Sequence, residues 1–86
     1  MSLTKDAIQV FLAVLDKGSF SAAARSIGRV PSAVSMTIAN LEADLDLGLF
    51  DRSGRYPQLT PAGERIVAQA RAVLASSEQL QAVALE

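Results

Sequence analysis

Two glycines, Gly18 and Gly28, divide the first half of the chain into three segments, each with helical periodicity. The first segment, from about Thr4 to Lys17, carries one apolar stripe at i, i+3, i+4 and i+7, as an amphipathic helix does. Four residues form this stripe: Ile8, Phe11, Leu12 and Leu15. Gly18 follows at the position where a left-handed residue commonly ends a helix. The pattern predicts a domain that begins with short, packed helices.

The second segment is predicted to be a shorter helix, from about Ser21 to Ile27. Its expected N-cap is Ser19 or Ser21, because a serine hydroxyl accepts a hydrogen bond from an amide of the first turn. The run Ala22–Ala24 has high helix propensity and almost no side-chain bulk. Another helix can therefore approach this one closely.

The third segment is predicted to be a helix that starts near Pro31, since proline is well tolerated at the first helical position. Its apolar residues fall on one face: Val34, Ile38, Leu41 and Leu45. Its opposite face is small and mostly polar: Ser32, Ser35, Met36, Ala39 and Asn40. Asp46 and Gly48 mark its end. A helix with such short exposed side chains suits entry into a groove about 12 Å wide, the width of the DNA major groove.

Beyond Gly48 the helical periodicity stops and later resumes. Leu49-Phe50 and Gln58-Leu59 are predicted to be two short strands joined by a turn that contains Gly54. Thr60 and Pro61 then provide an N-cap and a first helical residue for a last helix that runs almost to Glu86. At about 1.5 Å per residue this helix is roughly 37 Å long, too long to lie wholly on so small a domain.

The last helix repeats its apolar residues in alternating steps of four and three, the spacing of a heptad seam. The seam consists of Ile66, Ala70, Val73, Ser77, Leu80 and Ala84, and Val67 and Leu74 widen it. We predict a dimerisation surface made of Ile66, Ala70, Val73, Leu74, Leu80 and Val83. The alternative is that this face folds back on its own domain. The length of the helix argues against that for Val73, Leu80 and Val83, which would otherwise expose apolar surface.

The order of these elements indicates the fold class. It is mainly α: a winged helix-turn-helix with a small two-stranded wing and a long C-terminal dimerisation helix. We expect residues 1–60 to form the DNA-binding domain and residues 61–86 the linker and dimerisation helix. A small-residue helix, a tight turn and a helix with a short-chained exposed face together favour docking in the major groove.

Spaced motifs along the chain resemble those of LysR-type transcriptional regulators. They are Phe11 and Val14, GSFSAAA (18–24), SAVS (32–35), Ile38, Leu41-Glu42, Leu49-Phe50, Arg52, Arg55 and LTPAG (59–63). The resemblance extends from about Leu3 to Arg71. Because it is an ordered set of motifs, it is far more specific than a single helix-turn-helix pattern.

The resemblance implies a bacterial transcription factor that binds an inverted-repeat site on double-stranded DNA as a homodimer. The third helix would read the major groove, and the wing would touch the backbone or the minor groove. The long helix would pair two copies. A small-molecule effector is expected only through a C-terminal domain that is absent from this sequence.

We predict eight DNA-binding residues: Ser21, Arg29, Ser32, Ser35, Met36, Asn40, Arg52 and Arg55. All but Arg55, for which DNA contact is favoured, have a simpler role open to them. Ser21 could act as a cap alone, Arg29 could be a solvated charge, and Arg52 could pair with a carboxylate such as Glu42. Ser32, Ser35, Met36 and Asn40 would then be ordinary surface positions.

The sequence departs from the family pattern at the third helix. Val30-Pro31 replaces the frequent Ser/Thr-Gln, and Met36 and Ala39 stand where basic or amide side chains are common. Direct hydrogen-bond readout by this helix is therefore expected to be thin. Asp46 replaces a glycine, so the end of the helix is expected to be shaped differently.

Composition limits the other functions. The chain has no cysteine and no histidine, so disulfides, zinc–thiolate sites and cysteine nucleophiles are excluded. No enzyme activity, cofactor or metal is expected. The start of the chain does not have the apolar core of a signal peptide, and its apolar stretches are too short to span a bilayer. We therefore expect a cytoplasmic protein without a membrane partner.

The charge of the chain keeps a second hypothesis open. The net charge is −1 and the pI about 5.3, which argues against tight non-specific DNA binding, a process driven by phosphate neutralisation. Between Arg52 and Arg71, however, there are four arginines and one acid, so a local positive patch is predicted. The alternative function is a protein-interaction or dimerisation module with little DNA binding.

Overall fold

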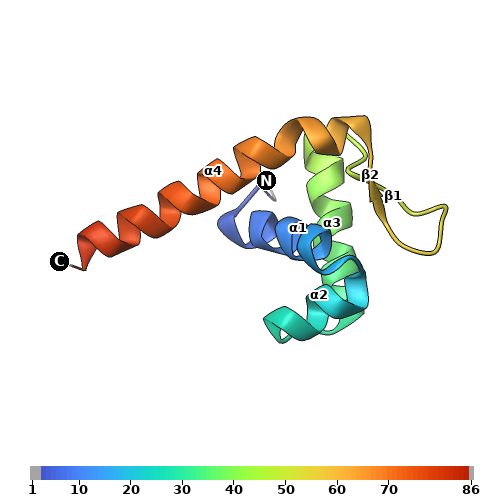
Figure 1. Cartoon of the computed structure of the whole chain (residues 1–86), viewed down its shortest axis with the longest axis horizontal. Coiled ribbons are helices and arrows are strands. Elements are labelled where there is room, and N and C mark those ends of the chain that lie inside the picture. Colours follow the sequence, from blue (N-terminus) through green and yellow to red (C-terminus); the bar gives the residue numbers. More distant parts are fainter. Residues whose placement is uncertain (1–2, 86) are drawn as a thin grey trace.

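The computed structural model describes residues 3–85, which form four helices and a two-stranded antiparallel sheet. The elements are α1 (Lys5–Lys17), α2 (Phe20–Ile27), α3 (Pro31–Leu45), β1 (Phe50–Asp51), β2 (Gln58–Leu59) and α4 (Pro61–Ala84). Figure 1 shows α1, α2 and α3 as the body, the strands and their loop at one end, and α4 extending past the body toward the C-terminus. The predicted winged helix-turn-helix architecture is confirmed.

Hydroxyl side chains start three of the four helices. The side chains of Thr4, Ser19 and Thr60 accept hydrogen bonds from the amides of the residues three positions on, at 3.1, 3.0 and 3.0 Å. Ser19, with extended backbone, caps α2. The prediction that α2 begins at Ser21 was therefore one residue late. A capping role for Ser21 is wrong, because Ser21 already lies within the first turn.

Left-handed residues end the first three helices. Gly18 and Gly28 have φ of 85° and 69°, and Asp46 ends α3 with φ of 53°. The left-handed region costs most side chains energy, and aspartate is among the residues that tolerate it best. The amide of Leu47 donates to the Glu42 carbonyl at 3.1 Å, which satisfies a terminal acceptor of the helix. Asp46 therefore ends α3 in the conformation that a glycine would adopt.

The core lies between α1, α2 and α3. The apolar stripes predicted for α1 and α3 point into it, and Val34, Ile38 and Leu41 are fully buried. Ala23 and Ala24 of α2 are buried as well. Their small side chains allow α2 to pack between α1 and α3, which places α3 with its polar face toward solvent.

The wing is attached to this core at its first strand. Phe50 pairs with Leu59 across the sheet, and its ring lies 5.5 Å from that of Phe11 and 6.0 Å from that of Phe20, between centroids. The Glu42 carboxylate accepts hydrogen bonds from the amides of Leu49 (2.6 Å) and Phe50 (3.3 Å). Strand β1 begins one residue later than predicted. Glu42 of α3 is hydrogen-bonded directly to the backbone at its start.

The first half of α4 packs on the body. Ile66, Val67 and Leu74 contact the core, and Ala70 is buried in it. An ion pair between Arg71 and Asp16, 2.7 Å long, joins α4 to α1. The helix ends at Ala84, in agreement with the prediction that it runs almost to Glu86, and Glu86 itself lies outside the described residues.

Candidate nucleic-acid interface

The solvent-facing side of α3 carries the five side chains predicted from the sequence. Ser32, Met36, Ala39 and Asn40 are exposed, and Ser35 is half-buried. Met36 is 63% exposed, and Val30, the residue before the helix, is 62% exposed. This face is small and uncharged, as the sequence predicted, and Met36 and Val30 make it partly apolar. The contacts of these residues with DNA stay a prediction.

Arg52 connects the wing to this face of α3. Its Nη1 donates to the Ser35 hydroxyl at 3.2 Å, and its guanidinium carbon lies 4.2 Å from the centroid of the Phe20 ring. A cation held over an aromatic face gains electrostatic stabilisation from the ring. The considered pairing of Arg52 with Glu42 is wrong, because Glu42 binds the backbone of β1 instead. Ser35, Arg52 and Phe20 form what we call the wing junction.

The tip of the wing presents Arg55 to solvent. Its guanidinium lies 5.3 Å from the centroid of the Tyr56 ring, itself half-exposed. At the other side of the turn the Asp51 carboxylate accepts a hydrogen bond from the Ser53 amide at 2.9 Å. That hydrogen bond lowers the pKa of Asp51. The turn is thus braced by Asp51. Arg55 is exposed beside Tyr56, and its contact with DNA stays a prediction.

Arg29, in the turn between α2 and α3, is held by a carboxylate. Its Nη1 donates to Asp6 Oδ2 at 3.0 Å, and its Nη2 bonds the other oxygen of the same carboxylate. The hydrogen bond from Arg29 lowers the pKa of Asp6. The alternative that Arg29 is a freely solvated charge is therefore wrong. Its contact with phosphate stays a prediction. Ser21 lies exposed in the first turn of α2, and its contact with DNA likewise stays a prediction.

The predicted dimerisation residues divide into two sets. Ala70 is buried within its own chain, and Ile66 and Leu74 pack against the same core. Val73, Leu80 and Val83 are exposed by 49%, 70% and 59%, which leaves an apolar stripe along the far half of α4. Their role in dimerisation stays a prediction.

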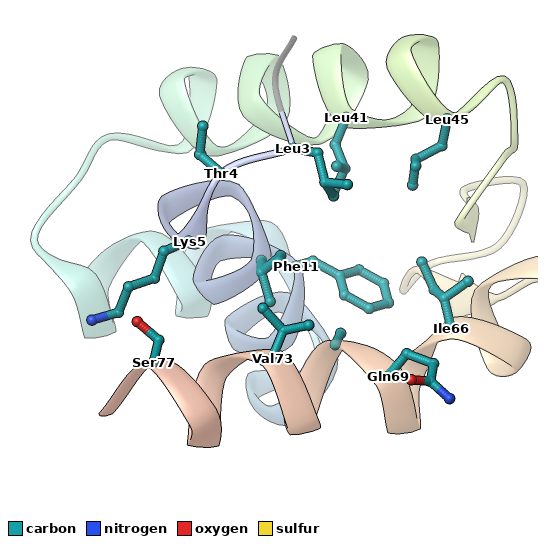
Figure 2. A pocket seen from close by; sticks show the side chains of 12 residues that line it. Leu3, Thr4, Lys5, Phe11, Leu41, Leu45, Ile66, Gln69, Val73 and Ser77 are labelled. Atoms are coloured by element: carbon teal, nitrogen blue, oxygen red, sulfur yellow. The ribbon is translucent and has the colours of Figure 1, made fainter. Parts of the chain in front are cut away.

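An apolar groove adjoins this stripe. It has a volume of about 410 Å³ and lies between α1, α3 and α4. Figure 2 shows Leu3, Leu41, Leu45, Ile66 and Val73 around it, with α4 along one side. Val73 belongs both to the groove and to the exposed stripe, so the two form one continuous apolar surface.

Sequence reasoning missed two aromatic residues of the interface. Phe20 supports Arg52, and Tyr56 lies beside Arg55. Both contacts join residues whose relation depends on how the wing folds against the helices. The only signal in the sequence was the phenylalanine within the GSFSAAA motif, next to the cap of α2.

A search of residues 3–85 finds no helix that is both long and apolar enough to cross a membrane.

Comparison with known proteins identifies relatives over most of the chain. The HTH-type transcriptional regulator AceR of Acinetobacter baumannii is 58% identical over 64 residues, 74% of this chain and 21% of the relative. The probable HTH-type transcriptional regulator YhaJ of Escherichia coli is 43% identical over 79 residues, 92% of this chain and 26% of the relative. The chain thus spans only about a quarter or less of the length of these relatives.

Solved structures with the same fold include one bound to DNA. A complex of the BenM DNA-binding domain with benA site 1 DNA aligns with a TM-score of 0.91 at 27% identity, over 95% of this chain and 92% of that one. CbnR, a LysR family transcriptional regulator, aligns with a TM-score of 0.89 at 28% identity, over 95% of this chain and 28% of that one.

A sequence model of the bacterial regulatory helix-turn-helix proteins of the lysR family matches residues 6–64. That range covers all of α2, α3 and the wing, and nearly all of α1. The match includes every helix and strand from which the interface is built. The chain therefore belongs to the LysR family of bacterial regulatory helix-turn-helix proteins and carries the DNA-binding module of that family.

Proposed function

We propose that this chain binds an inverted-repeat site on double-stranded DNA as a homodimer. In each copy α3 enters the major groove and the wing reaches the backbone or the minor groove. One observation carries the proposal: the bond from Arg52 to Ser35 holds the base of the wing against the exposed face of α3. Short side chains for a groove and cationic side chains for phosphates thus lie on one surface. The DNA complex of BenM, whose fold is the same, supports this docking.

The charge distribution supports binding that is selective and not merely electrostatic. Arg52 and Arg55 extend from the wing, whereas Arg29 and Arg71 are engaged with Asp6 and Asp16. Each phosphate contact adds to affinity through counterion release. With only these two arginines on the wing of each copy, a single module gains little non-specific affinity there. The pairing of two copies and their contacts with bases supply the rest of the binding affinity.

The exposed stripe of α4 supports the dimer. Val73, Leu80 and Val83 face solvent in the single chain, and burial of apolar surface at about 25 cal/mol per Å² favours pairing with a second copy. A two-fold interface uses the same patch on both copies. We propose residues 1–60 as the DNA-binding domain and residues 61–86 as the linker and dimerisation helix.

The wider context follows from the family. Relatives are named as transcriptional regulators, and we propose a regulatory role in the bacterial cytoplasm, with no catalytic role. Any small-molecule effector would act through a part of a longer protein outside this sequence, in keeping with the greater length of the relatives.

Selection of duplexes from a random DNA pool at moderate salt tests the proposal. Binding should enrich an inverted repeat, with half-sites about one helical turn apart. Absence of enrichment, together with no binding to any duplex at low salt, would overturn it. That result would favour the alternative, a protein-interaction module.

A further inference from the structure

We propose that the ion pair between Asp16 and Arg71 sets the spacing of the two half-sites that a dimer of this chain prefers. The inference rests on the proposed dimer and its DNA binding, and it gives a positioning role to two residues outside the predicted DNA-binding set. The geometry that carries it is the seat of α4 on the body, with an ion pair on one flank of the helix and an open apolar groove on the other.

The start of α4 is fixed to the wing. The Thr60 amide donates to the Leu49 carbonyl at 3.0 Å. Gly63 packs so closely on the same carbonyl oxygen that an added Cβ would collide with it. The first turn of α4 is therefore a fixed point, and the direction of the remaining helix decides where its exposed half lies relative to α3.

The two flanks of α4 meet different parts of the body. At 3.6 residues per turn, Ile66 and Val73 lie to one side of the buried Ala70, and Arg71 lies to the other. Ile66 and Val73 line the groove beside the start of α1 (Figure 2). Arg71 instead reaches the last turn of α1, where its Nη2 donates to the Asp16 carboxylate at 2.7 Å. The helix thus lies between an ion pair at the end of α1 and a groove at its start.

These two flanks act on α4 in opposite directions. Closing the groove buries more of Val73, which is 49% exposed, and apolar burial favours that movement. The ion pair opposes it, because a turn of α4 toward the groove draws Arg71 away from Asp16. Both charged side chains are half-exposed, so the pair gives the present direction a preference of only about twofold to fivefold. A preference of that size is enough to choose between closely similar directions.

A small change in direction becomes a large displacement at the dimer. The part of α4 beyond Gly63 is roughly 31 Å long at about 1.5 Å per residue, so a turn of about 10° moves its far end by roughly 5 Å. One base pair of DNA rises by only about 3.4 Å. In a two-fold dimer paired through the exposed stripes, both copies change direction alike. The separation of the two α3 helices, and with it the preferred half-site spacing, follows the direction of α4.

Duplexes that differ only in the spacing of the half-sites test the proposal. The starting duplex is the one enriched from the random pool, and a single base pair is added to its centre or removed from it. Fluorescence anisotropy at moderate salt gives each affinity, and the ratio to the starting duplex is the spacing discrimination. Arg71→Gln should lower this discrimination about twofold to fivefold and keep the preferred half-site sequence. Lys17→Gln, which removes a positive charge beside Asp16 without breaking the ion pair, should keep the discrimination of the wild type.

A charge swap separates the ion pair from other effects of Arg71. Asp16→Arg alone places two positive charges against each other and should lower the discrimination at least as far as Arg71→Gln does. Asp16→Arg combined with Arg71→Asp restores an opposite pair and should recover most of the loss.

Salt gives an independent readout. Exposed charges are screened at high ionic strength, so added salt should lower the discrimination of the wild type toward that of Arg71→Gln. The discrimination of the variant itself should change little, because the pair that salt would screen is already gone.

Each outcome decides a separate statement. A wild type that binds all spacings equally, or an Arg71→Gln variant with unchanged discrimination, would overturn the positioning role. A charge swap that recovers nothing would overturn it too, as would a loss in Arg71→Gln that is the same for every spacing. Failure to enrich or bind any duplex would instead overturn the proposed DNA binding, and equal affinity for single and paired half-sites would overturn the proposed dimer.

Discussion

Gly63 shows how a single position ties the long helix to the wing. It lies in the first turn of α4 and is buried. A Cβ added there would collide with the backbone carbonyl oxygen of Leu49 and would come within 2.9 Å of Leu59 Cδ2. The backbone carbonyl cannot move without displacing the start of β1. The glycine of the LTPAG motif is therefore required by close packing between α4 and the wing.

Gly63→Ala should lower the free energy of unfolding by about 1–3 kcal/mol, the usual cost of overpacking. Urea denaturation followed by circular dichroism measures it. Gly48→Ala is the matched control, because an added Cβ there meets no atom within 4 Å and Gly48 has no positive φ. This control should stay as stable or gain up to about 1 kcal/mol. Equal losses in the two variants would show that packing at Gly63 is not the cause.

Residue roles were predictable where they depend on near neighbours in sequence. Thr60 was expected to cap α4 and does so. Asp46 was expected to change the end of α3, but its backbone adopts the left-handed conformation and ends the helix as a glycine would. The choice between Ser19 and Ser21, and the partner of Arg52, depended on backbone angles and tertiary contacts that a linear pattern does not contain.

At the scale of elements, periodicity predicted the helices well. The stripes of α1 and α3 are the buried faces, because both helices are long enough to define an apolar side. The strands are two residues each, too short to show an alternating pattern of apolar and polar residues. Their bounds are set by the pairing of β1 with β2. Helix α4 has one continuous seam in sequence, yet its first half is covered by the body and its second half is exposed. Only the three-dimensional path of the chain reveals that division.

The exposed half of α4 gives a test of the dimer. Leu80→Lys puts a charge in the proposed interface, where burial without a partner is costly, and should shift the chain from dimer to monomer. Sedimentation equilibrium measures the change, and the expected weakening is about tenfold or more. Ala82→Lys is the control, since it adds the same charge on another side of the helix, outside the predicted seam. A dimer that survives Leu80→Lys unchanged would place the interface elsewhere.

Across the whole molecule, net charge is a poor guide to where DNA would bind. The chain carries −1 overall, but several acidic side chains serve internal contacts. Asp6 and Asp16 pair with arginines, Glu42 holds β1, and Asp51 braces the wing turn. The charged side chains outside these contacts are unevenly distributed. Among them, Arg55 is an exposed positive charge at the tip of the wing. The acids that lower the pI therefore also hold parts of the fold together, among them the wing turn and the start of β1.

Arg55→Ala tests this distribution. If Arg55 contacts one phosphate, its loss should weaken binding to specific and random duplexes alike and reduce the slope of log K against log salt by about 1. Fluorescence anisotropy over a salt series measures both quantities. Arg65→Ala, which removes the same charge from an exposed position on α4, should leave the slope nearly unchanged. Equal slopes for the wild type and Arg55→Ala would show that the wing tip does not neutralise a phosphate.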